Sequence, residues 1–177
     1  GAKTFEVKDL LITSTGDQNT GVYAADGVVN ISAKNTPVAP ATDGRDNSIT
    51  MSGNNSIGIF AAATGDTLSS GAKIALTGDS STGIFAKSSG AVTNTGEISA
   101  SGKSVKAIIA QAATITSTGK IIVNGTALSD KDGSVGLASM NGGNLTQNNA
   151  NTNITVDGSA SIGAYADGKV GVPAPVA

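Results

Sequence analysis

The stretch IALTGDSSTGIFA at residues 74–86 repeats along the chain, and the copy before it, ITMSGNNSIGIFA at residues 49–61, is almost the same phrase. Each copy has an isoleucine, a glycine four residues later, and a tetrad of Gly-aliphatic-aromatic-Ala type whose aliphatic and aromatic positions vary. The chain of 177 residues holds six such copies. A period of about 25 residues is typical of a solenoid, in which each repeat is one structural unit stacked on the last.

Two glycine positions accompany the isoleucine. The glycine four residues after it is present in all six copies, whereas the second glycine is replaced once by Ala107, with Lys106 as an equally acceptable alignment. Such glycines mark either backbone with positive φ or a corner too tight for a Cβ atom. The isoleucines are Ile12, Ile49, Ile74, Ile98, Ile121 and Ile154; the first glycines are Gly16, Gly53, Gly78, Gly102, Gly125 and Gly158; the second glycines are Gly21, Gly58, Gly83, Gly136 and Gly163.

Each unit contains about three short apolar runs, one of them six residues before the isoleucine at Leu68, Val92 and Ile115. In a later unit Leu145 takes this place and the following turn is three residues longer. Runs of this length fit strands of about 4–6 residues rather than helices. The Asn, Ser and Thr residues between them predict turns and side-chain ladders between coils.

Three short strands per unit predict an all-β fold, a parallel β-helix of about six coils of roughly 25 residues. The isoleucines would stack into its dry core. The crossover rule for parallel strands makes this helix right-handed. One such domain is expected over residues 1–177, with insertion loops at about 35–48 and 126–133 and a Pro-containing tail at 169–177. Both chain ends resemble those of an excised piece, so we expect the natural protein to continue in both directions.

Composition argues against several functional classes. The formal net charge is −2 and no basic run occurs, which disfavours a nucleic-acid partner. The chain has no cysteine or histidine, so it cannot form disulfides or Cys-based metal sites. No apolar run approaches the roughly 20 residues that a membrane span needs. Neither acidic run, at 43–46 or 130–133, has the ligand spacing of a calcium loop. We therefore expect no metal and no cofactor.

An enzyme is the competing class, because β-helices also host polysaccharide lyases and hydrolases. Those activities need acids that converge on one face, alone or together with His, Lys or Arg. Here the five glutamates and aspartates nearest the repeats sit at different offsets, and Arg45 is the single arginine. The sequence therefore predicts a protein that is not an enzyme.

Four of the five aromatic residues fall in one column of the repeat, at Tyr23, Phe60, Phe85 and Tyr165. If the aliphatic residue before each ring points inward, the rings form an exposed stripe that could dock sugars or a protein partner. Alternatively, the strand bends at this point and the rings cover the glycine-lined corner or join the core. The second arrangement is favoured because exposed aromatic stripes are rarer than packed ones. The remaining units carry Ile109 and Ala138 in this column.

The longest insertion is the second candidate binding region. Loops that project from a rigid solenoid often carry binding residues. Pro37 and Pro40 keep this one extended, and Asp43, Arg45 and Asp46 are expected to form its polar tip. The alternative is a surface excursion with no partner.

Three segments, TGKIIVNG at 118–125, TGEISASG at 95–102 and STGIFA at 81–86, resemble passenger repeats of bacterial autotransporter (type V secretion) adhesins. They are most similar to those of the large fusobacterial outer-membrane adhesins, and the resemblance covers roughly residues 5–168. It implies a right-handed β-helical passenger displayed on the bacterial cell surface. Its partners would be host cell-surface proteins or glycans, or other bacteria. Trimeric autotransporter heads have shorter repeats, so a monomer is expected. A stalk, with binding elsewhere in the parent protein, is the alternative.

Replacing Ile74 by aspartate tests the inward position of the isoleucine column. An unpaired charge in a dry core is expected to cost more than about 4 kcal/mol and to unfold the central coils. Ala75→Asp, one residue along and on the opposite face, is the control and should cost far less. Thermal unfolding followed by circular dichroism measures both. Equal melting temperatures for Ile74→Asp and the parent would contradict the inward assignment.

Overall fold

The computed structural model describes residues 4–25, 27–33, 46–62, 67–88, 90–128, 133–148 and 154–167. Within these residues the chain forms eighteen strands and no helix. All strand pairs are parallel, and the strands form three six-stranded sheets that we name A, B and C. Consecutive strands of the chain lie in different sheets, and each strand pairs with the strand three places further along.

The strands of the three sheets are short. Sheet A contains β1 (Thr4–Val7), β4 (Val28–Ile31), β7 (Thr67–Ser70), β10 (Ala91–Asn94), β13 (Thr114–Ser117) and β16 (Asn144–Gln147). Sheet B contains β2 (Leu11–Ser14), β5 (Ser48–Met51), β8 (Lys73–Leu76), β11 (Ile98–Ala100), β14 (Ile121–Val123) and β17 (Ile154–Val156). Sheet C contains β3 (Thr20–Ala24), β6 (Ile57–Ala61), β9 (Thr82–Lys87), β12 (Lys106–Gln111), β15 (Val135–Met140) and β18 (Ile162–Asp167).

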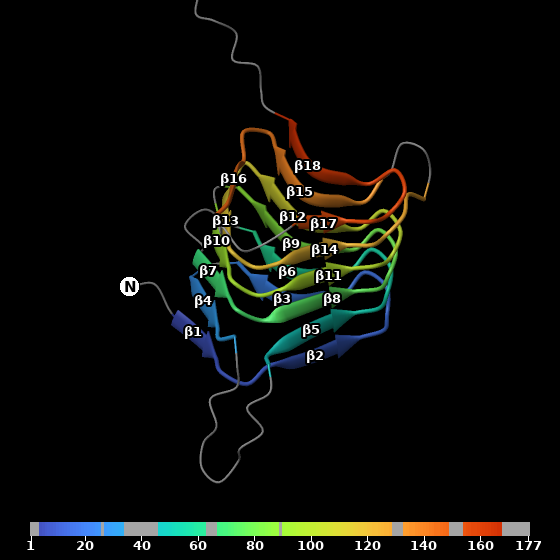
Figure 1. The fold of residues 1–177 in the computed structure, drawn as a ribbon. Helices are drawn as coiled ribbons and strands as arrows, with labels where there is room; N and C mark the ends of the chain where they lie inside the picture. Colours follow the sequence, from blue (N-terminus) through green and yellow to red (C-terminus); the bar gives the residue numbers. More distant parts are fainter. Residues whose placement is uncertain are drawn as a thin grey trace, which may run out of the picture.

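Three consecutive strands complete one coil, so the three sheets form the sides of a rod. Figure 1 shows the six coils stacked in sequence order, from the blue coil that contains β1 to the red coil that contains β18. This arrangement confirms the predicted right-handed parallel β-helix with three short strands per coil.

The isoleucine column forms the centre of the core. Ile49, Ile74, Ile98 and Ile121 are paired in register on sheet B and are at most 1 % exposed. Ile12 and Ile154, in the first and last coils, are partly buried. The predicted inward orientation of this column is confirmed.

Sheet A supplies the third apolar position. Leu68, Val92 and Ile115 are buried and lie in one register column. Leu145 pairs with Ile115, so the longer turn in that unit is confirmed.

Register also decides the ambiguous fourth unit. Ile108 pairs with Ile84, and Lys106 pairs with Thr82. Ala107 therefore occupies the glycine position, and the alternative alignment on Lys106 is wrong. Ala107 is fully buried.

The glycine that follows each isoleucine is required by close approach of neighbouring coils. A Cβ atom on Gly78 would lie 2.0 Å from the carbonyl oxygen of Gly53, and one on Gly102 would lie 2.2 Å from that of Gly78. Among the described residues only Gly27 and Gly142 are glycines with positive φ, and neither belongs to this column. The tight-corner explanation holds for this column and the positive-φ explanation is wrong.

Positive φ occurs two residues after the column, within the turn from sheet B to sheet C. Asn55, Ser80 and Ser104 have φ values of 54°, 56° and 53°. Polar residues with short side chains tolerate this left-handed conformation better than bulky or β-branched ones. The same turn shape can therefore recur in successive coils.

The turns are joined by a ladder of side-chain and backbone hydrogen bonds. The amide of Asn54 donates to Oδ1 of Asp17 at 2.7 Å, the amide of Asp79 donates to Oδ1 of Asn54 at 2.8 Å, and the amide of Lys103 donates to Oδ1 of Asp79 at 2.8 Å. Each side chain thus satisfies a turn amide of the next coil. This confirms the predicted ladders in these turns.

The second glycine and the isoleucine belong to one packing unit. A Cβ atom on Gly58 would lie 2.7 Å from the carbonyl oxygen of Gly83 and 3.0 Å from the γ2 methyl of Ile74. The isoleucine of one coil therefore fills the space left by the glycine of the preceding coil. The same 3.0 Å approach recurs between Gly21 and Ile49, Gly83 and Ile98, and Gly136 and Ile154.

Substituting alanine for Gly78 tests the close approach between coils. The added Cβ would overlap the Gly53 carbonyl oxygen at 2.0 Å, so we expect a loss of at least about 2 kcal/mol of unfolding free energy. Gly163→Ala is the matched control, because its nearest atom, a γ methyl of Val156, lies 3.9 Å away. Urea unfolding measures both variants. A loss that is the same at both positions would show that glycine flexibility, and not the contact, explains the column.

Candidate functional site

The aromatic column lies on the outer face of sheet C. Phe60 and Phe85 each follow an isoleucine, Ile59 and Ile84, that is fully buried, so period-2 alternation directs the rings outward. Tyr23 is 58 % exposed, and the two phenylalanines are partly exposed. The favoured prediction that these rings join the core is therefore wrong, and the exposed stripe is the arrangement that forms.

Three of the rings form a continuous stack. The ring centroids of Tyr23 and Phe60 are 5.4 Å apart at an interplanar angle of 47°, and those of Phe60 and Phe85 are 5.2 Å apart at 17°. Nζ of Lys87 lies 5.4 Å from the centroid of Phe60. In-register parallel pairing causes this stacking, because it places the same repeat position of each coil directly beside the next.

Tyr165 lies apart from the other three rings. Ile109 and Ala138 occupy the column between Phe85 and Tyr165, so two coils separate these two rings. Tyr165 is 45 % exposed. The structure therefore brings three of the four predicted aromatic residues together and leaves the fourth at the far end of the same face.

A groove crosses the outer face of sheet C where the ring column is interrupted. We call it the Ala138 groove; its volume is about 330 Å³. The middle strand β15 provides its floor, and β12 and β18 provide its walls. Sequence reasoning missed this feature, although the alanine within an otherwise bulky column was its signal. The groove is lined by Ile109, Val135, Ala138, Met140, Ile162 and Tyr165, with Lys106 beside them.

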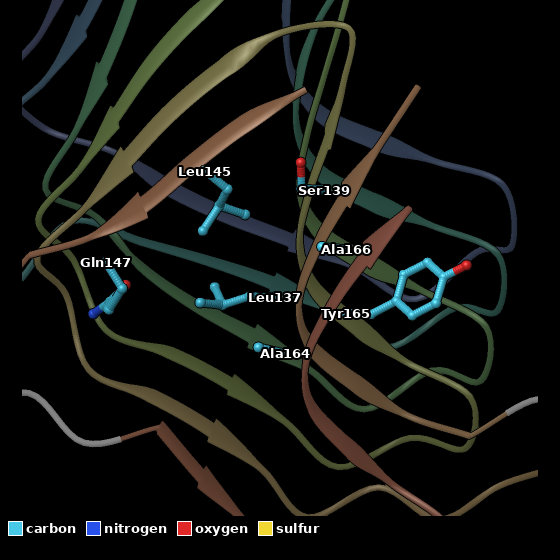
Figure 2. Close-up of a pocket in the computed structure, with 7 residues that line it drawn as sticks. All are labelled: Leu137, Ser139, Leu145, Gln147, Ala164, Tyr165 and Ala166. Atoms are coloured by element: carbon cyan, nitrogen blue, oxygen red, sulfur yellow. The ribbon is translucent and has the colours of Figure 1, made fainter. Parts of the chain in front are cut away.

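A second hollow, also of about 330 Å³, belongs to the core of the last coil. Figure 2 shows Leu137, Leu145 and Ala164 on the inner side of their strands, with Tyr165 directed away from them. Leu137 and Leu145 belong to the inward register columns of sheets C and A. This hollow belongs to the interior of the rod, and none of the described residues that line it is charged.

The insertion residues separate into two groups. Asp43 and Arg45 lie outside the described residues. Asp46 lies where the insertion rejoins the coil, and its Oδ2 pairs with Nζ of Lys73 at 2.5 Å. The hydrogen bond and the charge of Asp46 raise the pKa of Lys73 above its ordinary value, and Glu97 acts in the same direction. The prediction that Asp46 is part of a projecting tip is wrong, because its side chain is tied to strand β8.

Within the described part of the chain, no group of three or more His, Cys, Asp or Glu side chains is arranged to hold a metal ion. The same residues contain no helix that is long and apolar enough to cross a membrane. No protein-family model, curated protein or solved structure matches this chain.

Truncating Phe60 tests the cohesion of the stack. Phe60→Ala removes both ring contacts, each worth about 0.5–1.5 kcal/mol, so we expect a loss of about 1–3 kcal/mol. Tyr165→Ala is the control, because no ring contact involves Tyr165 among the described residues. Its loss of unfolding free energy should be smaller. A double-mutant cycle of Phe60 and Phe85 with no coupling energy would contradict the stack.

Proposed function

We propose that this chain is a segment of a surface-exposed adhesin passenger that attaches a bacterium to host cells or to other bacteria. The observation that carries the proposal is the outward column of Tyr23, Phe60 and Phe85 on one side of a stiff rod. The similarity of the repeats to autotransporter passengers, noted from the sequence, supports display on the cell surface. The proposal assigns no catalytic step to the chain.

The rod contributes by holding the rings in a fixed line. Hydrogen bonds link every coil to the next along three sheets, so the stack keeps its geometry without a partner. A preorganised aromatic surface loses little side-chain entropy on binding, and aromatic residues are enriched at binding hot spots. These properties favour a contact surface along sheet C.

A stalk that only spaces other binding domains is the second candidate. The outer faces of sheets A and B favour it, because their outward positions are mostly Ser, Thr and Asn. On sheet A, for example, one register column begins with Glu6 and continues with small polar side chains, at Asn30, Ser69, Thr93, Thr116 and Thr146. Such a surface is inert and suits a spacer. The two candidates differ in whether sheet C binds anything.

The test is binding of the labelled chain to mammalian epithelial cells, immune cells and partner bacteria. We expect saturable binding that is lost when Tyr23, Phe60 and Phe85 are all replaced by threonine, which keeps β propensity and removes the rings. The matched control changes the outer column of sheet B, with Thr50→Ala and Ser99→Ala, and should bind like the parent. Circular dichroism confirms that each variant is folded.

A further variant with residues 36–46 replaced by a short turn separates the loop from the stripe. If binding is lost in this variant and kept in the threonine variant, the binding site lies in the loop at residues 36–46. Absence of binding by the parent would leave the stalk, and turnover of a glycan by the parent would overturn both candidates.

A further inference from the structure

The ring column of sheet C has a vacant place in the fifth coil. In the first three coils each coil contributes one ring, and successive rings lie 5.2–5.4 Å apart, close to one coil spacing. In the fifth coil the same register position holds Ala138, between Ile109 on one side and Tyr165 on the other. Ala138 lines the groove and is itself 4 % exposed. The column therefore leaves the space of one ring unfilled.

The chemistry of the Ala138 groove suits an aromatic ring. Val135, Met140 and Ile162 complete an apolar lining around Ala138, and the groove volume of about 330 Å³ exceeds that of one aromatic side chain. A thioether such as that of Met140 makes favourable contacts with aromatic rings. A ring in this place would also lie one coil spacing from Tyr165, the distance at which the rings of this column stack.

Lys106 places a positive charge at one end of the groove. Nζ of Lys106 donates a hydrogen bond to the backbone carbonyl oxygen of Ser104 at 3.1 Å, and no carboxylate pairs with it among the described residues. Lys106 pairs in register with Val135 at one end of the groove, whereas Asp167 pairs with Met140 at the other end, so the positive charge belongs to the Lys106 end. The whole chain is acidic, with a net charge of −2. This local positive charge complements an acidic group on a partner.

We propose that the Ala138 groove binds an aromatic side chain of a partner protein that carries a carboxylate beside that side chain. The ring enters the vacant place of the column between Ile109 and Tyr165, and the carboxylate pairs with Lys106. This inference rests on the proposed function, because it names the kind of partner that the face of sheet C takes. A glycan fits the groove less well, since the Tyr165 hydroxyl and the Lys106 ammonium are the only polar side-chain groups in its described lining.

The chain contains a built-in reporter for the test. It has two methionines: Met140 lies in the groove, and Met51 is fully buried in the core. With ¹³C-methyl methionine, titration with the dipeptide acetyl-Asp-Phe-amide is expected to shift the Met140 methyl resonance in a saturable manner. The Met51 resonance should stay in place and reports that the core is intact. Acetyl-Asp-Ala-amide, which lacks the ring, should give no saturable shift.

Two variants and one control assign the contacts. Ala138→Phe fills the vacant place from within the chain and should abolish the response to acetyl-Asp-Phe-amide. Lys106→Gln should weaken binding several-fold and remove its preference over acetyl-Asn-Phe-amide. Ala91→Phe places the same ring on the exposed outer face of sheet A and should bind like the parent. If Ala138→Phe shifts the Met51 resonance, that variant has altered the core, and the Lys106→Gln variant then tests the proposed site.

Several results would overturn the proposal. One is the absence of a Met140 shift with the parent protein. Another is an unchanged response in Ala138→Phe with an intact Met51 signal. The third is equal binding of acetyl-Asp-Phe-amide and acetyl-Asn-Phe-amide to the parent. A Met140 shift that grows with protein concentration alone, together with dimers in sedimentation, would assign the groove to a second copy. If the parent protein does not bind cells but responds normally to the dipeptide, the proposed function is wrong and the proposed groove site stands. If the parent binds cells but shows no dipeptide response, the groove site is wrong and the proposed function stands.

Discussion

In-register stacking of the same repeat position in successive coils is the constraint on which the rest of this structure depends. Parallel pairing puts each residue about 4.8 Å from its counterpart in the next coil, so each position must be compatible with copies of itself. Isoleucine satisfies this inside the rod, where Ile49, Ile74, Ile98 and Ile121 contact one another through the core. The sequence motif therefore recurs in each coil because each coil has the same geometry.

Close spacing of the coils also determines what occupies the corners. Carbonyl oxygens of one coil lie where a Cβ of the next would be, which leaves glycine as the residue that fits at Gly78 and Gly102. Buried polar side chains at the corners bond to the backbone of neighbouring coils. The Ser81 hydroxyl donates to the Gly53 carbonyl oxygen at 3.1 Å and accepts from the Ser56 amide at 3.1 Å. Core, corner and turn thus support one another, which makes the rod stiff.

Outward-facing side chains follow the same in-register stacking as the core. The pairing that stacks isoleucines inside stacks Tyr23, Phe60 and Phe85 outside, because the two columns follow one register. A regular surface feature is therefore a by-product of the core, and departures from it are more informative. Ala138 is such a departure, and it lines a groove on the outer face of sheet C. Recognition by a solenoid of this kind would combine a repeated stripe with the places where the repeat is broken.

The sequence by itself determined the coil count, the three short strands per coil and the inward isoleucines, because periodicity and alternation depend on local spacing alone. It also placed Leu145 correctly, three residues out of step with the earlier units. It did not determine which way the rings point, or why the glycines recur, since both depend on contacts between residues about 25 positions apart. The pairing of Asp46 with Lys73, the choice of Ala107 over Lys106, and the Ala138 groove were likewise decided by the tertiary structure. Register between coils is a property of the assembled sheets, and the sequence of a single strand does not specify which residues of the next coil it pairs with.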